Sequence, residues 1–249
     1  MNPYFAEFIG TTILVLLGNG VVANVVLSRT KGHNSGWIVI TAGWAIAVYV
    51  GAFCAAPASG AHLNPAVTIA LALAGKFDLA SLPGYVLAQM LGGITGGTLV
   101  YLFYRPHFAV SDNPDGKLAC FCTAPNIRSM PQAFFCEVVG TFVLILSIFL
   151  VTQASFQMPG VADPSEVPIG LGSLGLLPVA LVVFGIGLSL GGTTGYAINP
   201  ARDLGPRIAH SLLPIPGKRD SDWRYSWVPV FGPLVGAVLA VLVYATCCL

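Results

Sequence analysis

The charged residues of this 249-residue chain are spaced so widely that they leave long uncharged windows. A helix that crosses the hydrocarbon core of a bilayer needs about 20 mostly apolar residues, and every window is long enough for one. Only 8% of the residues are charged, against about 25% in an ordinary soluble domain, which is too few to cover a water-facing surface. The chain is therefore predicted to be an integral membrane protein. The uncharged windows are 8–28, 32–75, 79–104, 138–162, 167–201 and 225–249.

The apolar segments predict a bundle of helices. They show no sustained alternation with period 2, which disfavours a transmembrane β-barrel, and lipid leaves helices as the other way to satisfy every backbone polar group. The first apolar run has no basic stretch before it and carries Glu7 near its start, so we expect it to remain a helix and not a cleaved signal peptide. The net charge of +1 excludes a basic nucleic-acid-binding surface. The expected spans are about 4–27, 37–54, 82–104, 131–152, 174–190 and 226–245.

The two halves of the chain repeat one another. Residues 5–11 match 135–141 at an offset of 130, and residues 60–66 match 195–201 at an offset of 135. Each half holds an odd number of spans, so the second half must enter the membrane from the opposite side, as an inverted repeat. We expect a single membrane channel domain over 1–249, with a first repeat at 3–104, a connecting loop at 105–130 and a second repeat at 131–246.

An Asn-Pro-Ala box interrupts the same place in each half. Asn is a good N-cap and Pro is favoured at the first helical position, so each box should start a short helix, over 67–74 and 202–212. Such half-helices cannot cross a bilayer, and in an inverted repeat their positive N-terminal ends would meet near the midplane. The extended residues before each box expose carbonyls, which is tolerable there only along a wet cavity. The boxes are Asn64, Pro65 and Ala66, and Asn199, Pro200 and Ala201.

These motifs resemble the aquaporin, or major intrinsic protein, family over roughly 3–245, and its aquaglyceroporin branch in particular. The resemblance implies an all-α membrane protein with six transmembrane helices and two re-entrant half-helices. It further implies a passive channel for glycerol and similar small uncharged solutes, and for water, that excludes ions and protons. Such a protein would sit in the cell membrane as a homotetramer in the lipid bilayer. It would need no cofactor or metal and bind no nucleic acid.

The resemblance also places a selectivity filter of four residues beside the second box. In water-selective members the position of Gly187 is commonly His, so glycine here implies room for a larger solute. Trp44 and Tyr196 would form an apolar corner, and Arg202 would offer donors to hydroxyls. Tyr196 departs from the Phe that is frequent in the glycerol-conducting branch, and a phenol would narrow the pore or add a polar contact. Further marks of that branch are Asp203, Arg207, Pro229 and Val230.

Two acidic residues lie at matching positions inside the apolar runs. Glu7 and Glu137 could face water at the helix starts, but a carboxylate inside the membrane is a functional candidate by default. By resemblance they brace the pore loops by accepting backbone N–H bonds. Without the alignment, Gly187 would be interpreted as a helix-packing residue and Trp44 as a lipid-facing aromatic. The carbonyls expected to line the pore belong to Gly60, Ala61, His62, Leu63, Ala197 and Ile198.

Other functions and one conflict stay open at this point. A mainly water-selective channel is an alternative, as is an ion-coupled secondary transporter with inverted repeats. An enzyme is not expected, because no set of nucleophile and base or cluster of metal ligands lies in the spans. The family places both termini in the cytoplasm, which puts ten of the eleven Lys and Arg residues outside. The positive-inside rule predicts the opposite orientation.

Overall fold

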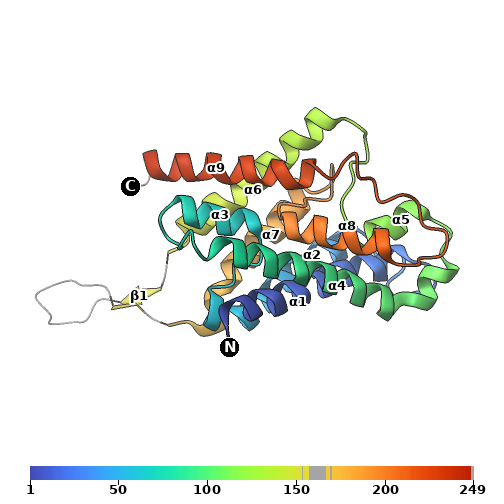
Figure 1. Cartoon of the computed structure of the whole chain (residues 1–249), viewed down its shortest axis with the longest axis horizontal. Coiled ribbons are helices and arrows are strands. Elements are labelled where there is room, and N and C mark those ends of the chain that lie inside the picture. Colours follow the sequence, from blue (N-terminus) through green and yellow to red (C-terminus); the bar gives the residue numbers. More distant parts are fainter. Residues whose placement is uncertain (153, 157–166, 169, 248–249) are drawn as a thin grey trace, which may run out of the picture.

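The computed structural model describes residues 1–152, 154–156, 167–168 and 170–247, and it consists almost entirely of helices (Figure 1). Among these residues, two strands of two residues each, β1 (Ser155–Phe156) and β2 (Val167–Pro168), form a short antiparallel ladder. The helices are α1 (Pro3–Val26), α2 (Trp37–Ser59), α3 (Pro65–Leu73), α4 (Leu82–Val110), α5 (Pro114–Ala119), α6 (Met130–Leu150), α7 (Leu177–Ser189, preceded by a 3₁₀ turn at Gly172–Leu176), α8 (Pro200–Leu212) and α9 (Val228–Cys247).

Six of the described helices are long and apolar enough to cross a membrane: α1, α2, α4, α6, α7 with its 3₁₀ turn, and α9. Large apolar side chains remain exposed on their outer faces, among them Leu87 and Phe103 on α4 and Phe231 and Leu242 on α9. A soluble monomer rarely exposes so much contiguous apolar surface, whereas lipid requires it. The chain is a multi-pass membrane protein, and the predicted fold class is confirmed.

Two helices run further than the charge pattern predicted. Helix α2 continues five residues past 54 through Pro57, and α4 continues six residues past 104 through Pro106. The connection 105–130 is thus partly helical, since it holds the end of α4 and all of α5. A charge such as Arg105 is costly within lipid but does not stop a helix. Helix α2 ends at Gly60, whose φ of 80° is left-handed and accessible to glycine without strain.

The half-helices α3 and α8 each pack against a helix of the other repeat. Helix α8 lies along α4, and α3 lies along α9. The α4–α8 crossing is close because glycines face each other, and a Cβ added to Gly93 would lie 2.4 Å from the carbonyl oxygen of Ala201. In lipid, where packing and not hydrophobicity drives helix association, small residues at a crossing permit such contact. The repeats therefore interlock around the two Asn-Pro-Ala boxes.

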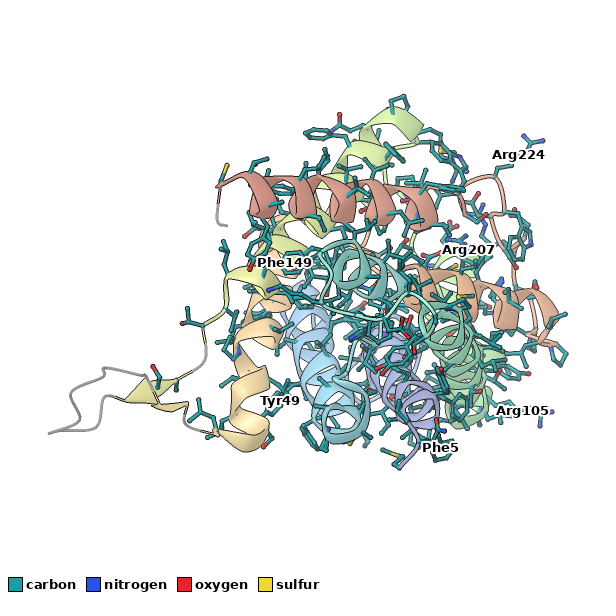
Figure 2. All side chains as sticks on the ribbon, turned by 60° about the vertical axis from the view of Figure 1, so that its left-hand side comes forward. Phe5, Tyr49, Arg105, Phe149, Arg207 and Arg224 are labelled. Atoms are coloured by element: carbon teal, nitrogen blue, oxygen red, sulfur yellow. The ribbon has the colours of Figure 1, made fainter. Side chains whose placement is uncertain are left out.

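Both chain termini lie toward one end of the bundle, and α5 lies at the other (Figure 1). We call these the terminal end and the α5 end. Arg105 and Arg224 project outward from the bundle, whereas Arg207 points into its interior (Figure 2). Arg207 is fully buried.

Candidate functional site

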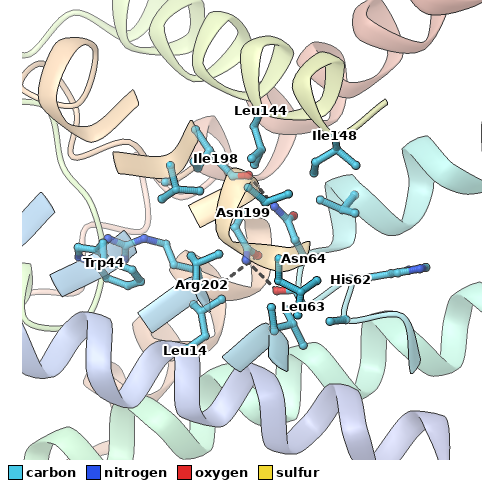
Figure 3. Close-up of a pocket in the computed structure, with 18 of the residues that line it drawn as sticks. Leu14, Trp44, His62, Leu63, Asn64, Leu144, Ile148, Ile198, Asn199 and Arg202 are labelled. Carbon is cyan, nitrogen blue, oxygen red and sulfur yellow. Dashed lines mark hydrogen bonds between the residues drawn. The ribbon is translucent and has the colours of Figure 1, made fainter. Parts of the chain in front are cut away.

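The two box asparagines face each other in the middle of the bundle (Figure 3). The Oδ1 atom of Asn64 caps α3 by accepting from the N–H of Ala66 at 2.9 Å, and its Nδ2 donates to the Ile198 carbonyl at 2.8 Å. Asn199 caps α8 in the same way, and its Nδ2 donates to the Leu63 carbonyl at 2.8 Å. Each amide thus commits one N–H to the opposite loop. The second N–H of each amide is left for a molecule in the pore.

The loops before the boxes have an unusual backbone that is the same in both halves. Ala61 and Leu63 have φ values of 54° and 51°, and their counterparts Tyr196 and Ile198 have values of 39° and 43°. A non-glycine residue in this left-handed region is strained, and such strain persists only where the surroundings fix it. In each loop these left-handed residues alternate with residues of negative φ, and this alternation turns successive N–H groups to one side of the loop and carbonyls to the other.

Glu7 and Glu137 accept those N–H groups. Glu7 accepts from the N–H groups of His62 at 2.9 Å and Leu63 at 2.7 Å. Glu137 accepts from the N–H groups of Ala197 at 3.0 Å and Ile198 at 2.9 Å. Both carboxylates are buried and neither faces water. Because the N–H groups are held on the carboxylate side, the carbonyls are left to face the pore.

A cavity of about 230 Å³ runs along these carbonyls on the terminal-end side of the filter region. One wall is formed by the two loops, with every residue whose carbonyl was predicted to line the pore. The other wall is apolar and is formed by Leu14, Val48, Leu144, Ile148, Val179 and Val183 among others. The imidazole of His62 points away from the asparagines (Figure 3) and packs on Phe77 and Tyr85. His62 therefore contributes backbone to this cavity.

A second, open cavity of about 720 Å³ lies at the α5 end, and Trp44, Tyr196 and Arg202 line both cavities. These three side chains form the layer between the cavities. The guanidinium carbon of Arg202 lies 3.9 Å from the centre of a Trp44 ring, so the cation stacks on the aromatic face. The Arg202 side chain makes no hydrogen bond to the described residues, and its Nη1 is buried without a partner among them.

Gly187 is the filter position where the structure corrects the sequence interpretation. We expected its missing side chain to leave room for solute. A Cβ there would lie 2.9 Å from Cζ of Tyr196 and 2.9 Å from Cγ2 of Thr41, so the space is already filled, largely by the tyrosine ring. Gly187 lines neither cavity. Because Gly187 has no side chain, the Tyr196 ring can lie directly against α7.

Asp203 and Arg207, one helical turn apart on α8, form a buried ion pair with an N–O distance of 2.8 Å. Asp203 also accepts from the N–H and the hydroxyl of Thr123, at 2.7 and 2.6 Å. Arg207 donates to the carbonyls of Thr123 and Ser221, both at 2.8 Å. A buried ion pair is tolerated when further hydrogen bonds satisfy it, as here. The pair ties the loops of the α5 end to the helix that carries Arg202.

The open cavity has a charged rim. Arg128 binds Asp222 through both of its terminal nitrogens, at 2.5 and 2.7 Å, and Arg219 pairs with Asp115. The hydrogen bonds from Arg128 hold the pKa of the Asp222 carboxyl below its usual value. Asp222 therefore stays ionised and keeps the loop 213–227 fixed against the start of α6.

Several residues that shape the site were missed in the sequence. Gln89 donates to Glu7 at 2.8 Å, and Trp37 donates from its ring nitrogen to the Gly187 carbonyl at 2.9 Å. Gly18 makes room for the Trp44 ring, because a Cβ there would lie 2.2 Å from it. These residues stand far from the motifs in sequence and in no recognisable spacing. Asp203 and Arg207 were named from the sequence as marks of the family branch, but their ion pair was not predicted.

Comparison with known proteins agrees with this geometry. The family described as "Major intrinsic protein" matches residues 1–244. The chain belongs to this family. It is 52% identical to the probable glycerol uptake facilitator protein of Thermotoga maritima over 98% of both chains. It is also 52% identical to the glycerol uptake facilitator protein of Streptococcus pneumoniae strain R6, covering 98% of this chain and 99% of that one.

A solved structure of the same family has the same fold. The aquaglyceroporin from Plasmodium falciparum superimposes with a TM-score of 0.80 at 32% identity, covering 98% of this chain and 95% of that one. The resemblance inferred from the two Asn-Pro-Ala boxes is confirmed at the level of the family.

Proposed function

We propose that this major intrinsic protein is a passive channel for glycerol and similar small uncharged solutes, together with water. The observation that carries the proposal is the two-sided wall of the central cavity, with a row of loop carbonyls facing an apolar surface. A linear polyol has hydroxyls along one side and hydrocarbon along the other. It can exchange its water for the carbonyls while its carbon chain stays against the apolar wall. The glycerol uptake facilitators among the relatives support this assignment.

The layer formed by Trp44, Tyr196 and Arg202 serves as the selectivity filter in this proposal. Arg202 donates to solute oxygens, and Trp44 contacts the hydrocarbon side. Since Arg202 lies 3.9 Å above Trp44, the guanidinium must shift along or off the ring as a solute passes. A desolvated cation–π contact such as this one is worth about 2 kcal/mol, a barrier that hydrogen bonds from Arg202 to the solute can offset.

Protons and ions are excluded at two successive levels. The N-terminal ends of α3 and α8 meet at the asparagines and present positive partial charge, which disfavours cations there. The free N–H of each asparagine donates to a passing water and orients it against relaying a proton. Arg202 adds a full positive charge in the filter. An anion attracted by Arg202 would find too few donors beyond it to replace its hydration.

Assembly and orientation follow the family in this proposal. Four copies form a tetramer with one pore in each, and both termini face the cytoplasm. The α5 end, with its charged rim, then lies outside, and Lys76 near the C-terminal end of α3 is the cationic residue left inside.

Mass measurement in mild detergent tests the tetramer, and a stable monomer would contradict it. Labelling of a cysteine placed at exposed Arg224 by an impermeant reagent on intact cells tests the orientation, and protection would contradict it.

The deciding experiment is stopped-flow light scattering of proteoliposomes. An inward glycerol gradient should produce rapid reswelling after the initial shrinkage, and an impermeant osmolyte should produce shrinkage alone. Water flux without reswelling would indicate a water-selective channel. In voltage clamp, no current should follow a proton or salt gradient, and a current that scales with either gradient would favour the coupled transporter.

A further inference from the structure

The α5 end carries more positive charge than its own contacts use. Apart from Arg202 in the filter, several of its cationic side chains donate to backbone carbonyls or form ion pairs: Lys117, Lys218, Arg128, Arg207 and Arg219. The others are exposed, and their side chains make no hydrogen bond or ion pair to the described residues: Arg29, Lys31, Arg105 and Arg224.

Three of these free cations lie where helices α1 and α4 end side by side. The N–H of Ser28 donates to the Ser111 hydroxyl at 2.8 Å, and the Nδ1 of His107 donates to the Ser28 carbonyl at 3.0 Å. Arg29 follows Ser28 in the chain, and Arg105 precedes His107 by two residues. The turn after α1 is therefore held against the last turns of α4. We call the three side chains the seam cations: Arg29, Lys31 and Arg105.

The backbone of the turn after α1 is fixed. Arg29 has a φ of 62°, in the left-handed region that a non-glycine residue rarely adopts. The N–H of Gly32 donates to Oδ1 of Asn24 at 3.2 Å, which fastens the turn back onto α1. The N–H of Asn34 donates to the Val25 carbonyl at 2.9 Å and closes the turn. Strain of this kind persists only where the surroundings fix it, and it gathers at functional sites.

Apolar side chains continue from Arg105 into the membrane-spanning part of α4. Leu102 lies one helical turn before Arg105 on the same face and is 56% exposed, and Phe103 is 77% exposed. Arg105 projects outward from the bundle (Figure 2). A long cationic side chain next to exposed hydrocarbon is typical of a helix end at the headgroup level of a bilayer. Lipids whose acyl chains cover Leu102 and Phe103 therefore bring their headgroups to Arg105.

We propose that the seam cations bind the phosphate headgroup of an anionic lipid. A phosphodiester carries a negative charge and oxygen acceptors, which suit the fork of an arginine and the ammonium of a lysine. Asp112, the exposed carboxylate that follows Ser111, offsets only one of the three positive charges. A zwitterionic lipid carries its own cation beside the phosphate and gains less from the seam. The site therefore favours a lipid with a net negative charge.

The proposed lipid site uses charges that the proposed channel does not. None of the seam cations lines the central cavity or the open cavity. The family orientation puts most of the Lys and Arg residues outside, against the positive-inside rule, and a lipid partner gives three of them a function. The inference therefore does not rest on the channel function and is tested separately from it.

Native mass spectrometry of the purified protein measures the binding directly. The probes are a phosphatidylglycerol and a phosphatidylcholine with the same acyl chains, each titrated into the detergent-solubilised protein to obtain the dissociation constant of the first bound lipid. The phosphatidylglycerol should bind more tightly. Arg105→Gln should weaken its binding about fivefold, equal to ~1 kcal/mol for one cation at a membrane surface. Arg29→Gln should act similarly, and the double variant should lose about 25-fold. Binding of phosphatidylcholine should hardly change.

Arg224→Gln is the matched control. Arg224 is also an exposed cation of the α5 end without an ion pair among the described residues, and it lies well apart from Arg105 (Figure 2). Its substitution should leave the affinity for phosphatidylglycerol unchanged. The unfolding temperature of each variant without added lipid should match that of the unmodified protein. Because Arg29 and Arg105 lie on different elements, either single variant tests the site if the other fails to fold.

Three outcomes would overturn the inference. The first is equal affinity of the unmodified protein for the two lipids. The second is an equal loss in Arg105→Gln and Arg224→Gln, which would show that the charges act as a diffuse field and not as a site. The third is displacement of phosphatidylglycerol by inorganic phosphate at matched ionic strength, which would show that the seam takes free phosphate and not a lipid.

Discussion

Segments 59–73 and 194–212 approach the centre of the bundle from opposite ends and are held there by the same set of bonds. In each, a buried glutamate accepts two loop N–H groups, an asparagine caps the half-helix, and the asparagine amide donates to a carbonyl of the other loop. A serine or threonine hydroxyl adds a further bond, from Ser59 to Glu7 at 2.7 Å and from Thr194 to Glu137 at 2.8 Å. The backbone of the pore is thus nearly two-fold symmetric.

The side chains break this symmetry. At the 135-residue offset, Ala61 of the first segment corresponds to Tyr196, and Val67 corresponds to Arg202. The first segment therefore presents small apolar side chains to the central cavity, and the second presents Tyr196 and Arg202, which line both cavities. The symmetric bonds thus shape the central cavity, and these two differences between the segments place the proposed selectivity filter toward the α5 end.

The surroundings of the two buried glutamates, Glu7 and Glu137, differ as well, and this difference gives the largest expected effect on stability. Gln89 donates to Glu7, whereas among the described residues no side chain of α9 donates to Glu137, and the nearby Gly232 lies beside the Cβ of Glu137. In Glu7→Gln the amide of Gln89 can turn and present its unpartnered Oε1 to the new N–H₂ group. The new N–H₂ group meets a loop N–H in both variants, that of Leu63 in Glu7→Gln and that of Ile198 in Glu137→Gln, but only Glu7→Gln has a neighbouring side-chain amide that can offer it an acceptor. We expect a loss of about 2–3 kcal/mol for Glu137→Gln and about half of that for Glu7→Gln.

Thermal unfolding in detergent, followed by size-exclusion chromatography, measures this difference. Equal losses in the two variants would show that Gln89 does not compensate. If Gln89 does compensate, the double variant Glu7→Gln with Gln89→Ala should lose as much stability as Glu137→Gln.

Arg202→Val makes the second segment resemble the first at its filter position. Removing the cation widens the layer and removes its barrier to cations, so permeability to glycerol and to larger polyols should rise about tenfold, equal to ~1.4 kcal/mol. Solute swelling and current in voltage clamp measure the two effects. Arg224→Val deletes the same charge at an exposed site that lines neither cavity (Figure 2) and should change neither measurement. Unchanged selectivity in Arg202→Val would contradict the role given to Arg202.

A smaller effect is expected from Gly187→Ala, which tests how Tyr196 is seated. The added methyl would push the tyrosine ring from the wall toward the pathway, and such overpacking costs about 1–3 kcal/mol. Glycerol permeability should fall about fivefold while water permeability changes less. Gly185 lies on the same helix with nothing within 4 Å of an added Cβ, so Gly185→Ala is the matched control. If both variants lower the permeability to water and the permeability to glycerol equally, Gly187 acts only in helix packing.

The smallest expected effect on stability concerns the ion pair between Arg128 and Asp222 at the α5 end. Because Arg128 lowers the folded-state pKa of Asp222, the stabilisation is fully present above the ordinary aspartate pKa of about 4. It is lost as the pH falls through the lower, folded-state value. The unfolding temperature of the unmodified protein should therefore drop as the pH falls below about 4, and Arg128→Gln should flatten this part of the profile. An identical profile in both would show that the pair does not stabilise the loop.

The sequence by itself determined the parts of this protein that depend on local patterns. Uncharged windows gave the number of spans, the repeated motifs gave the inverted halves, and each Asn-Pro pair gave the start of a half-helix. These features depend on the cost of charge in lipid and on the capping of a helix end, which act within a few residues. The places of Glu7 and Glu137 beside the pore loops followed from the repeat together with the family resemblance.

The tertiary structure decided the rest, because it depends on contacts between residues far apart in the chain. The sequence could not show that Tyr196 fills the space above Gly187, since that depends on how the loop folds back onto α7. It could not show that Gln89 supports one brace and glycine lies beside the other, or that α3 and α8 pack against helices of the opposite repeat. In each case local pattern allowed several arrangements, and close packing of the bundle selected one of them.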